Sequence, residues 1–371
     1  MNGFTKKHNH TIAFAHHHIP SHHMGIKHLN QFVKRECPGA IKTVTFDDLS
    51  GKVVVVDANI YMYRFRADQA LLENMYTMIK LFQLRDIVPI FIFDGKPPDE
   101  KRNLLNKRQH LKRIAEIHYN QVKTSMDLTC CRPTPDDEHL LKVLKRRFIR
   151  LHDADFERVK ALMRALGVNY IVAPGEADAL CAQMVLKRKA HACVSDDTDM
   201  FVYGCPRVLR HLNLLDETFT MYDMSQILNI LGITLTEFRQ ICVVSGTDYN
   251  CMNAITSATV KSENGMKVEK TFNLHLKLTL KLFKQYKKCT QEAAITGNIV
   301  ATDFYIWLHH TCRTLYPRLK FDYDAVTAIN DMFDTTHVKM NQLPTLPINK
   351  PTSVDNELLH NVMAHENFIF V

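Results

Sequence analysis

Val53-Val54-Val55-Val56-Asp57 is the stretch that decides the fold, and a second apolar run, Val88 to Phe93, ends in the same way at Asp94. An unbroken apolar run of this length is typical of a strand buried on both faces of a parallel sheet. Residues 60–84, between the two runs, carry apolar side chains at helical spacing, as a crossover between parallel strands requires. The two stretches therefore predict neighbouring parallel strands, each followed by an aspartate at its carboxyl end.

The alternation of strands and helices continues downstream. The further elements expected are helix 155–166, strand 168–172, helix 176–187, a short strand ending at Ser195 and strand 208–212. Such an order is characteristic of an α/β fold, here a central, mostly parallel sheet flanked by helices on both faces. The basic stretch between the second and third strands has the pattern of two helical arms, so it predicts a helical insertion rather than a part of the core.

Composition divides the chain into segments. Residues 1–23 are polar and rich in histidine without apolar periodicity, and residues from Pro344 onward are rich in proline, asparagine and other polar side chains. The expected organisation is a disordered His-rich extension over 1–23, an α/β domain built from 24–98 and 151–250, a basic helical insertion over 99–150, a helical C-terminal region over 251–343 and a loosely ordered tail over 344–371.

Length and composition exclude several classes of protein. The chain has 371 residues, 46% of them hydrophobic, and no run approaches the roughly 18 apolar residues that a membrane span needs. Its N-terminus lacks the order of a signal peptide, and its ten cysteines form no CxxC pair, so we expect reduced thiols in the nucleus or, alternatively, the cytoplasm. The net charge of +8 favours a polyanionic partner, although many soluble proteins are mildly basic.

Acidic residues recur at the carboxyl ends of the predicted strands, where ligands of open parallel sheets gather. Unpaired carboxylates that converge there repel one another and raise one another's pKa, and divalent cations resolve this conflict. All-oxygen ligands without histidine or cysteine suit Mg²⁺, for which Mn²⁺ can substitute, and two such ions about 4 Å apart can promote phosphodiester hydrolysis. The predicted ligands of a two-Mg²⁺ site are Asp57, Asp94, Glu176, Asp178, Asp197, Asp199 and Asp248.

Each carboxylate also has an ordinary structural explanation. Asp57 and Asp94 could be turn residues or helix caps. Glu176 and Asp178 could complement a helix N-terminus, and the acidic residues over 195–199 could form a solvated loop. Only their joint recurrence at one edge of the sheet carries the metal-site interpretation.

At this point the chain resembles the flap endonuclease family of structure-specific 5′ nucleases over about 24–249. The motifs that carry the resemblance, in the family's order and approximate spacing, are Met24-Gly25-Ile26, Val56-Asp57-Ala58-Asn59, Phe93-Asp94-Gly95-Lys96-Pro97-Pro98, Pro174-Gly175-Glu176-Ala177-Asp178-Ala179, Asp197-Thr198-Asp199 and Gly246-Thr247-Asp248-Tyr249. The resemblance implies that 24–98 and 151–250 form one nuclease domain and that the insertion over 99–150 is an arch that admits a 5′ single strand.

The resemblance also assigns roles to basic and aromatic residues. Lys101 and Arg108 are similar to the family's catalytic basic pair, and their spacing of seven places them on one face of a helix. Tyr63 is similar in position to a tyrosine that stacks on a substrate base, although a tyrosine in a helix is often a core residue. Further DNA contacts are expected from Gly25, Lys112, Arg113, Arg146 and Arg147.

Three features depart from the family pattern. The chain has 23 residues before Met24, so either Met24 is the true start or the site is partly obstructed. The sequence Cys251 to Ser257 replaces the family's glycine-rich helix-hairpin-helix, which puts that mode of gripping duplex DNA in doubt. The tail, with Asn367-Phe368-Ile369-Phe370-Val371 at its end, has no convincing motif for binding a sliding clamp.

The sequence thus favours a metal-dependent 5′ flap endonuclease with 5′-3′ exonuclease activity, acting on flapped or branched DNA in replication or repair and having no membrane partner. A cut at the junction would leave a 5′-phosphate and a 3′-hydroxyl. Two alternatives stay open: an RNA-cutting nuclease on the same scaffold, because the carboxylates do not distinguish sugars, and a non-catalytic protein that binds DNA junctions.

Overall fold

A computed structural model describes residues 25–26, 28–129, 134–249, 257–261, 267–271, 274–296, 303–315, 322–335 and 354–364. The extension over 1–23 and Met24 lie outside the described residues. Within the described ranges no single helix is long and apolar enough to cross a membrane, and one bent pair, Met224–Leu231 with Leu235–Ser245, meets the criteria of length and composition only as a pair, at an angle of 83°.

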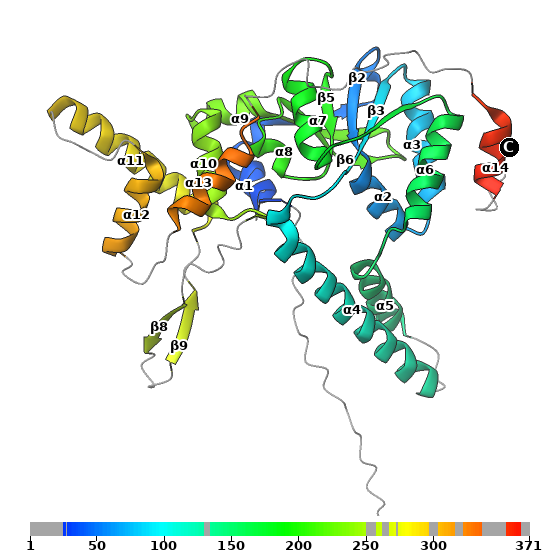
Figure 1. Ribbon diagram of the computed structural model, residues 1–371, viewed down its shortest axis with the longest axis horizontal. Helices are drawn as coiled ribbons and strands as arrows, with labels where there is room; N and C mark the ends of the chain where they lie inside the picture. The colour runs from blue at the N-terminus through cyan, green and yellow to red at the C-terminus, as the bar shows by residue number, and fades with distance from the viewer. Residues whose placement is uncertain are drawn as a thin grey trace, which may run out of the picture.

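A seven-stranded mixed sheet forms the centre of the protein (Figure 1), with the strand order β1-β7-β6-β5-β2-β3-β4. The strands are β1 (Ile41–Thr45), β2 (Val53–Asp57), β3 (Val88–Phe93), β4 (Asn169–Val172), β5 (Ala192–Val194), β6 (Arg207–Asn213) and β7 (Thr218–Asp223). The five strands from β6 to β4 are parallel to one another, whereas β7 is antiparallel to both β6 and β1. The expected mostly parallel sheet is therefore confirmed, and β2 lies within it.

Helices cover both faces of the sheet, because alternate side chains of each buried strand point to opposite faces. Val55 belongs to one hydrophobic core, while Val54 and Val56 belong to the other. The first core is covered by α1 (Leu29–Glu36), α7 (Ala177–Leu186), α8 (Asp199–Val202), α9 (Met224–Leu231), α10 (Leu235–Ser245), α11 (Leu276–Thr296), α12 (Phe304–Leu315) and α13 (Tyr323–Met332), and the second by α2 (Ala58–Ala67), α3 (Leu71–Leu84), α6 (Asp153–Ala165) and α14 (Asn356–Ala364).

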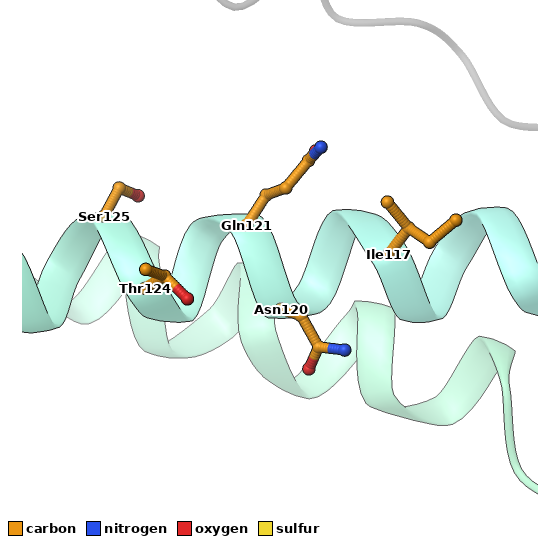
Figure 2. Close-up of a pocket in the computed structure, with 5 residues that line it drawn as sticks. All are labelled: Ile117, Asn120, Gln121, Thr124 and Ser125. Carbon is orange, nitrogen blue, oxygen red and sulfur yellow. The ribbon is translucent and has the colours of Figure 1, made fainter.

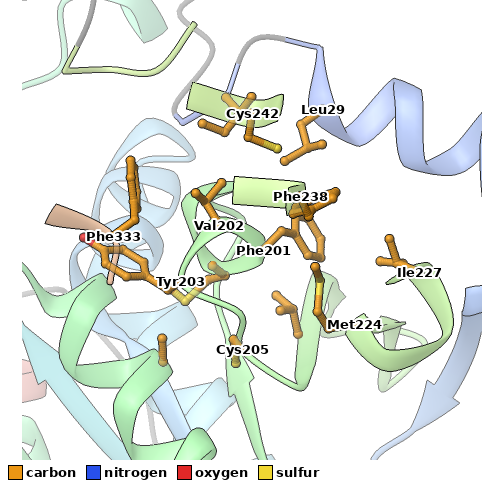
Figure 3. Close-up of a cluster of buried hydrophobic side chains, with 14 of the residues drawn as sticks. Leu29, Phe201, Val202, Tyr203, Cys205, Met224, Ile227, Phe238, Cys242 and Phe333 are labelled. Carbon is orange, nitrogen blue, oxygen red and sulfur yellow. The ribbon is translucent and has the colours of Figure 1, made fainter. Parts of the chain in front are cut away.

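The first core continues from the sheet into the C-terminal helices. Figure 3 shows Phe201 and Tyr203 of the α8 region close to Phe238 of α10 and to Phe333, which follows α13. The rings of Tyr203 and Phe333 are 5.0 Å apart in an edge-on arrangement, which favours contact between aromatic rings. This packing holds α10 and the end of α13 against the α/β core.

The helical crossover expected over 60–84 is present, and the structure divides it into two helices, α2 and α3. Gln69, between them, has a φ of 61°, a left-handed conformation that ends a helix. Two strands, β1 and β7, were not expected. β7 does show the alternation of an antiparallel strand, with Phe219 and Met221 buried, but β1 buries only Val44 and has almost no apolar signal.

The basic insertion consists of two helices, α4 (Arg102–Thr129) and α5 (Pro135–Arg147), preceded by a 3₁₀ turn over Asp99–Lys101. The two helices pack on each other and extend away from the sheet (Figure 1). At the base of this pair, the rings of Tyr119 and Phe148 lie 5.4 Å apart. The expected helical insertion is confirmed, whereas its role as an arch for a single strand stays a prediction.

The C-terminal region contains the expected helices α11, α12 and α13, but two of its features differ from the expected organisation. The region expected to be helical over 251–343 contains a two-stranded antiparallel hairpin, β8 (Ser257–Lys261) and β9 (Lys267–Thr271), ahead of its helices. The tail expected to be loosely ordered contains α14, whose Leu359, Val362 and Met363 are buried against the second core. These three side chains share one helix face at i, i+3 and i+4, a short signal that the surrounding proline-rich composition obscures.

The start of α10 offers a test of local stability. Thr234 and Glu237 form a reciprocal capping box, with the Thr234 N–H donating to Glu237 at 2.7 Å. Replacing Thr234 by Ala should lower the free energy of unfolding by about 1 kcal/mol, because an N-terminal N–H of the helix loses its acceptor. Urea denaturation measures the loss, with Thr234→Ser as the matched control that keeps the hydroxyl. Equal stability of the Ala variant and the wild type would contradict this role for the cap.

Candidate active site

The first two carboxylates are positioned by parallel strands and by the helices that follow them. Asp57 ends β2 and caps α2, accepting the Ile60 N–H at 3.4 Å. Asp94 follows β3 and accepts the Ala177 N–H of α7 at 2.8 Å, together with the Asn59 amide at 2.7 Å. Helix N-termini stabilise negative charge, so the fold holds both side chains at the carboxyl edge of the sheet.

Three further carboxylates form a compact group. Oxygen atoms of Asp178, Asp197 and Asp199 all lie within 4.8 Å of one another, and all three side chains are buried. Neither carboxylate oxygen of Asp199 has a hydrogen-bond partner among the described residues. A buried carboxylate without a partner is costly, and an all-oxygen group at this spacing matches the donors that Mg²⁺ and Mn²⁺ prefer. The residues present therefore fit a hard divalent cation.

The electrostatics of the edge are those of mutually repelling acids. Burial, followed by the charges of Asp94 and Asp197, raises the pKa of Asp57 to about 7. Burial and neighbouring carboxylates likewise hold the pKa values of Asp178 and Asp199 well above the ordinary range. The protein thus holds its acids where their charged form is disfavoured unless a cation compensates for it.

Lys101 reaches into this acidic edge from the base of the insertion. Its Nζ lies 2.6 Å from Glu176 Oε1, and the side chain is only 8% exposed. Burial lowers the pKa of Lys101, but the charges of Asp199 and Glu176 outweigh burial and raise it overall. The ammonium also lies 4.6 Å from the ring centre of Tyr249, whose hydroxyl donates a short hydrogen bond to Glu176. Lys101 is therefore held as a cation.

Arg108, seven residues after Lys101 and within α4, makes an ion pair with another carboxylate of the site. Its Nη2 lies 2.6 Å from Asp248 Oδ2, the same oxygen that accepts the Gly25 N–H at 3.3 Å. Arg108 lies within α4, whereas Lys101 belongs to the 3₁₀ turn before it, so the expectation of one regular helix for both is wrong. The side chains nevertheless converge on the same acidic edge.

Gly25 occupies a place where a side chain does not fit. Its φ is +75°, and an added Cβ would lie 2.3 Å from Asp197 Oδ1 and 2.4 Å from Thr198 Oγ1. The chain at Gly25 therefore passes directly against the carboxylates, a proximity for which the sequence gives only the Met-Gly motif as a signal.

The other residues expected to bind DNA lie on the insertion and on α2. The Tyr63 side chain is 41% exposed, so it is not a core residue, and the Lys112 ammonium lies 4.9 Å from its ring centre. Lys112 also donates to the Ile149 carbonyl at 2.8 Å. Arg146 pairs with Asp68 at 2.8 Å, and Arg113 is exposed while Arg147 is half-buried. Their roles toward DNA stay predictions.

Ser195 and Tyr249 are two residues of the site for which the sequence alone predicts no role. The Ser195 hydroxyl donates to Asp57 Oδ2 at 3.1 Å and accepts the Asp197 N–H at 3.1 Å, so it links two strand ends. In the sequence, the role of Ser195 is indicated only by its position as a small polar residue directly after a buried strand. Tyr249 was part of a quoted motif, but its contact with Glu176 depends on a fold that brings distant segments together.

A shallow pocket on α4 is unrelated to this site. Figure 2 shows its lining side chains on one stretch of the helix: Ile117, Asn120, Gln121, Thr124 and Ser125. None of them is acidic, basic or histidine, so the pocket offers no group for acid-base chemistry or for binding a cation.

Comparison with known proteins agrees with this geometry. Residues 24–115 match the family described as the XPG N-terminal domain, and residues 167–248 match the XPG I-region. The chain is similar to the flap endonuclease family over these two regions. The two matched regions contain all seven carboxylates and leave out most of the helical insertion.

The curated relatives are of moderate similarity. Flap endonuclease 1-B of Oryza sativa subsp. indica is 32% identical over 249 residues, covering 62% of this chain and 58% of the relative. Flap endonuclease 1 of Zea mays is 31% identical over 249 residues, covering 61% and 62% of the two chains. The chain therefore matches less than two thirds of the length of these curated relatives.

Solved structures share the fold at low sequence identity. The catalytic core of Rad2 in complex with a DNA substrate has a TM-score of 0.58 at 19% identity, covering 92% of this chain and 95% of that one. Human GEN1 in complex with Holliday junction DNA has a TM-score of 0.55 at 16% identity, covering 92% and 73%. The overall fold is thus shared with these two solved structures across almost the whole chain.

The raised pKa values predict how stability depends on pH without a metal ion. An acid whose pKa is higher in the folded state stabilises the fold below its unfolded pKa of about 4 and loses that contribution as the pH rises through the folded value. In EDTA, the free energy of unfolding should therefore fall between about pH 4 and the Asp57 pKa of about 7. Urea denaturation across this range measures the fall.

Asp199→Asn should weaken that fall and raise the stability in EDTA at neutral pH by about 1 kcal/mol or more, because it removes a buried charge without a partner. Mg²⁺ should then stabilise the wild type more than the variant. The matched control is Asp324→Asn, which alters an exposed carboxylate and should leave both effects unchanged. A destabilised Asp199→Asn variant in EDTA would contradict the repulsion described here.

Proposed function

We propose that this chain is a divalent-metal-dependent, structure-specific 5′ flap endonuclease with 5′-3′ exonuclease activity, hydrolysing phosphodiesters where single-stranded and double-stranded DNA meet. The observation that carries the proposal is the buried group of Asp178, Asp197 and Asp199, whose mutual repulsion is offset only in part by the nearby cations Lys101 and Arg210. The similarity to the XPG N-terminal domain and I-region and the shared fold support the reaction class. The relatives' names and the DNA in the Rad2 and GEN1 structures support the choice of nucleic acid.

The seven carboxylates would hold two Mg²⁺ ions, or Mn²⁺ in their place. Bound at such a site, the ions supply a nucleophilic water at neutral pH and stabilise the leaving oxygen. The residues of the chain itself orient and balance charge: Ser195 fixes Asp57, and the Asp199 N–H donates to Asp197 Oδ1 at 2.9 Å. The number and identity of the ions belong to the proposal.

Lys101 and Arg108 would stabilise the negative charge of the scissile phosphate. Both now neutralise carboxylates of the site, at 2.6 Å from Glu176 and from Asp248 respectively. When a phosphate and metal ions bind at the carboxylate site, the phosphate would be a new anionic partner for Lys101 and Arg108. The metal ions would be new cationic partners for Glu176 and Asp248. The ion pairs with Glu176 and Asp248 thus hold Lys101 and Arg108 where the scissile phosphate would bind.

The organisation of the chain fits a junction substrate. Residues 24–98 and 151–250 would be two parts of one nuclease domain, with the insertion over 99–150 as an arch that guides the 5′ single strand. Tyr63 and Lys112 lie against each other. The tyrosine ring would stack on a nucleobase, and the lysine would contact a phosphate. Gly25 would border the scissile position, while Arg113, Arg146 and Arg147 would contact phosphates. Such an activity would serve DNA replication or repair, and the protein would then be located in the nucleus.

Two other functions are separated from this one by experiment. An RNA-cutting nuclease would use the same carboxylates, because hydrolysis of a phosphodiester does not require recognition of the sugar. A non-catalytic junction-binding protein would not need the three buried aspartates to be so close, since their repulsion lowers stability without serving binding. The geometry therefore favours catalysis.

Asp197→Asn should abolish Mg²⁺-dependent cleavage of an end-labelled double-flap DNA while leaving its binding largely intact, because a metal ligand is lost but the basic surfaces are unchanged. Gel analysis of products from flap, blunt-duplex, single-stranded and RNA-flap substrates measures selectivity, with Asp324→Asn as the control. Retained cleavage by Asp197→Asn at saturating Mg²⁺ would contradict the site. Preference of the wild type for the RNA flap would replace DNA by RNA as the substrate.

Lys101→Gln should lower kcat by about 10²–10³-fold, the usual effect of removing one positioned group that stabilises transition-state charge. KM should change less, because DNA contacts many phosphates. Single-turnover cleavage separates the chemical step from binding, and Lys80→Gln, on α3, is the control. A variant that loses affinity but keeps the single-turnover rate would show that Lys101 only binds DNA.

A further inference from the structure

A buried arginine lies against the loop that carries two of the predicted metal ligands. Arg210 belongs to β6, and the residue is only 5% exposed. Its guanidinium lies 5.7 Å from the ring centre of Phe201 and 5.6 Å from that of Tyr222. A cation loses its hydration when it is buried, so this position lowers stability unless other groups compensate for it.

The surroundings of Arg210 satisfy only a part of its guanidinium. Nη2 donates a short hydrogen bond to the carbonyl oxygen of Asp196, whereas Nε and Nη1 have no hydrogen-bond partner among the described residues. Because buried donors without an acceptor are unfavourable, an apolar side chain of similar length would suit this position at least as well. Residues that break such a rule of packing are often found at functional sites.

Three consecutive residues of β6 hold the start of the loop between β5 and α8. The carbonyl of Leu209 accepts the Ser195 N–H at 3.1 Å. Arg210 binds the carbonyl of Asp196, and the His211 N–H donates to Asp196 Oδ1 at 2.8 Å. Both the backbone and the side chain of Asp196 are therefore fixed by β6.

The backbone of β6 is irregular at this point. Its pairing with β7 shifts register between Arg210 and Asn213, and His211 has a φ of 54°, a left-handed conformation that is uncommon outside glycine. Such irregularities redirect side chains and are common next to active sites. Here the Arg210 side chain and the His211 N–H reach the same residue, Asp196. The strand is thus shaped to hold the loop.

The carbonyl that Arg210 binds belongs to the peptide bond between Asp196 and Asp197. The N–H of the same peptide bond donates to Ser195 Oγ at 3.1 Å, so both sides of this planar group are fixed. Burial raises the pKa of Asp197, and the charges of Lys101 and Arg210 oppose this rise. The guanidinium therefore acts on Asp197 through the peptide plane as well as through its charge.

We propose that Arg210 is a positioning residue of the metal site, which fixes the peptide bond between Asp196 and Asp197 so that the Asp197 carboxylate stays beside Asp178 and Asp199. Without the guanidinium, the carbonyl of Asp196 loses its donor and the peptide plane is free to turn. A role as a counter-charge alone has the opposite consequence, because removing a nearby cation strengthens the binding of another cation. The effect on metal binding rests on the proposed function, whereas the contacts of Arg210 do not.

The test replaces Arg210 by Met, which fills similar space without a charge or a donor. Arg85→Met is the matched control, because Arg85 precedes β3 at the end opposite to Asp94 and pairs with Glu217. Urea denaturation checks the fold, and Arg210→Met should be at least as stable as the wild type. Hydrogen exchange in EDTA then measures the order of the amides over 196–199, and electron paramagnetic resonance measures the affinity for Mn²⁺.

Arg210→Lys is a second, more conservative variant. It keeps the positive charge, but its ammonium ends one bond short of the Nη2 position and cannot bind the Asp196 carbonyl in the same way. A positioning role predicts that both variants change the site in the same direction. A role as a counter-charge alone predicts that Arg210→Lys behaves like the wild type.

Arg210→Met should bind Mn²⁺ about 10–100-fold more weakly than the wild type, the usual effect of removing a group that orients a metal ligand. The amides over 196–199 should exchange faster while the other strands are unchanged, and Arg85→Met should alter neither property. Tighter Mn²⁺ binding by Arg210→Met, or unchanged exchange over 196–199, would overturn the proposal. Faster exchange throughout the sheet together with lower stability would show a purely structural role and would overturn it as well.

Flap cleavage by the wild type, measured separately with Mg²⁺, distinguishes this inference from the proposed function. A wild type that binds Mn²⁺ but cuts no nucleic acid removes the nuclease, while the Mn²⁺ affinities still decide the role of Arg210. If the wild type binds no Mn²⁺, the metal site fails and exchange in EDTA decides alone. Faster exchange confined to 196–199 then supports the positioning role, and unchanged exchange removes it.

Discussion

Electrostatic repulsion among buried carboxylates is the constraint on which the arrangement of this protein depends. Parallel strands bring Asp57 and Asp94 to one edge of the sheet, and the following segments add Asp178, Asp197 and Asp199. Repulsion and burial together disfavour their charged forms, as the raised pKa of Asp57 shows. Large hydrophobic cores on both faces of the sheet stabilise the fold enough to hold these acids together.

The surrounding structure offsets this repulsion only in part. Lys101 and Arg108 neutralise the outer acids Glu176 and Asp248, whereas both oxygens of Asp199 stay without a hydrogen-bond partner among the described residues. The unpaired charge is therefore concentrated at the centre of the site. A divalent cation would relieve this repulsion. Lys101 and Arg108, at the edge of the site, would then be available to bind a phosphate. Stability, metal binding and catalysis are thus properties of the same group of side chains.

The parts of the fold that the sequence predicts well are those with a continuous local signal. β3 coincides with its apolar run, and β2 ends at the aspartate that terminates its valines. By contrast, β1 takes its partner from β7, far along the chain, and shows no local pattern because a single side chain of it is buried. The helix α14 is similar, because its three buried apolar residues are recognisable as core residues only once α6 is known to pack beside them.

The site shows the same division between local and long-range information. The carboxylates are predictable because each follows a strand or begins a helix, and a parallel sheet gathers such positions at one edge. The contact of Tyr249 with Glu176, the bridge by Ser195 and the close approach of Gly25 depend on segments separated by many residues. No periodicity or composition encodes such contacts.

The most direct test of the central claim is crystallography of the protein with Mn²⁺, using anomalous scattering to locate the ion. An anomalous peak is expected among the carboxylate oxygens of Asp178, Asp197 and Asp199, and this peak should be lost in Asp199→Asn crystals grown in the same way. An empty carboxylate edge at saturating Mn²⁺ would contradict the claim that these acids are gathered to hold a metal ion.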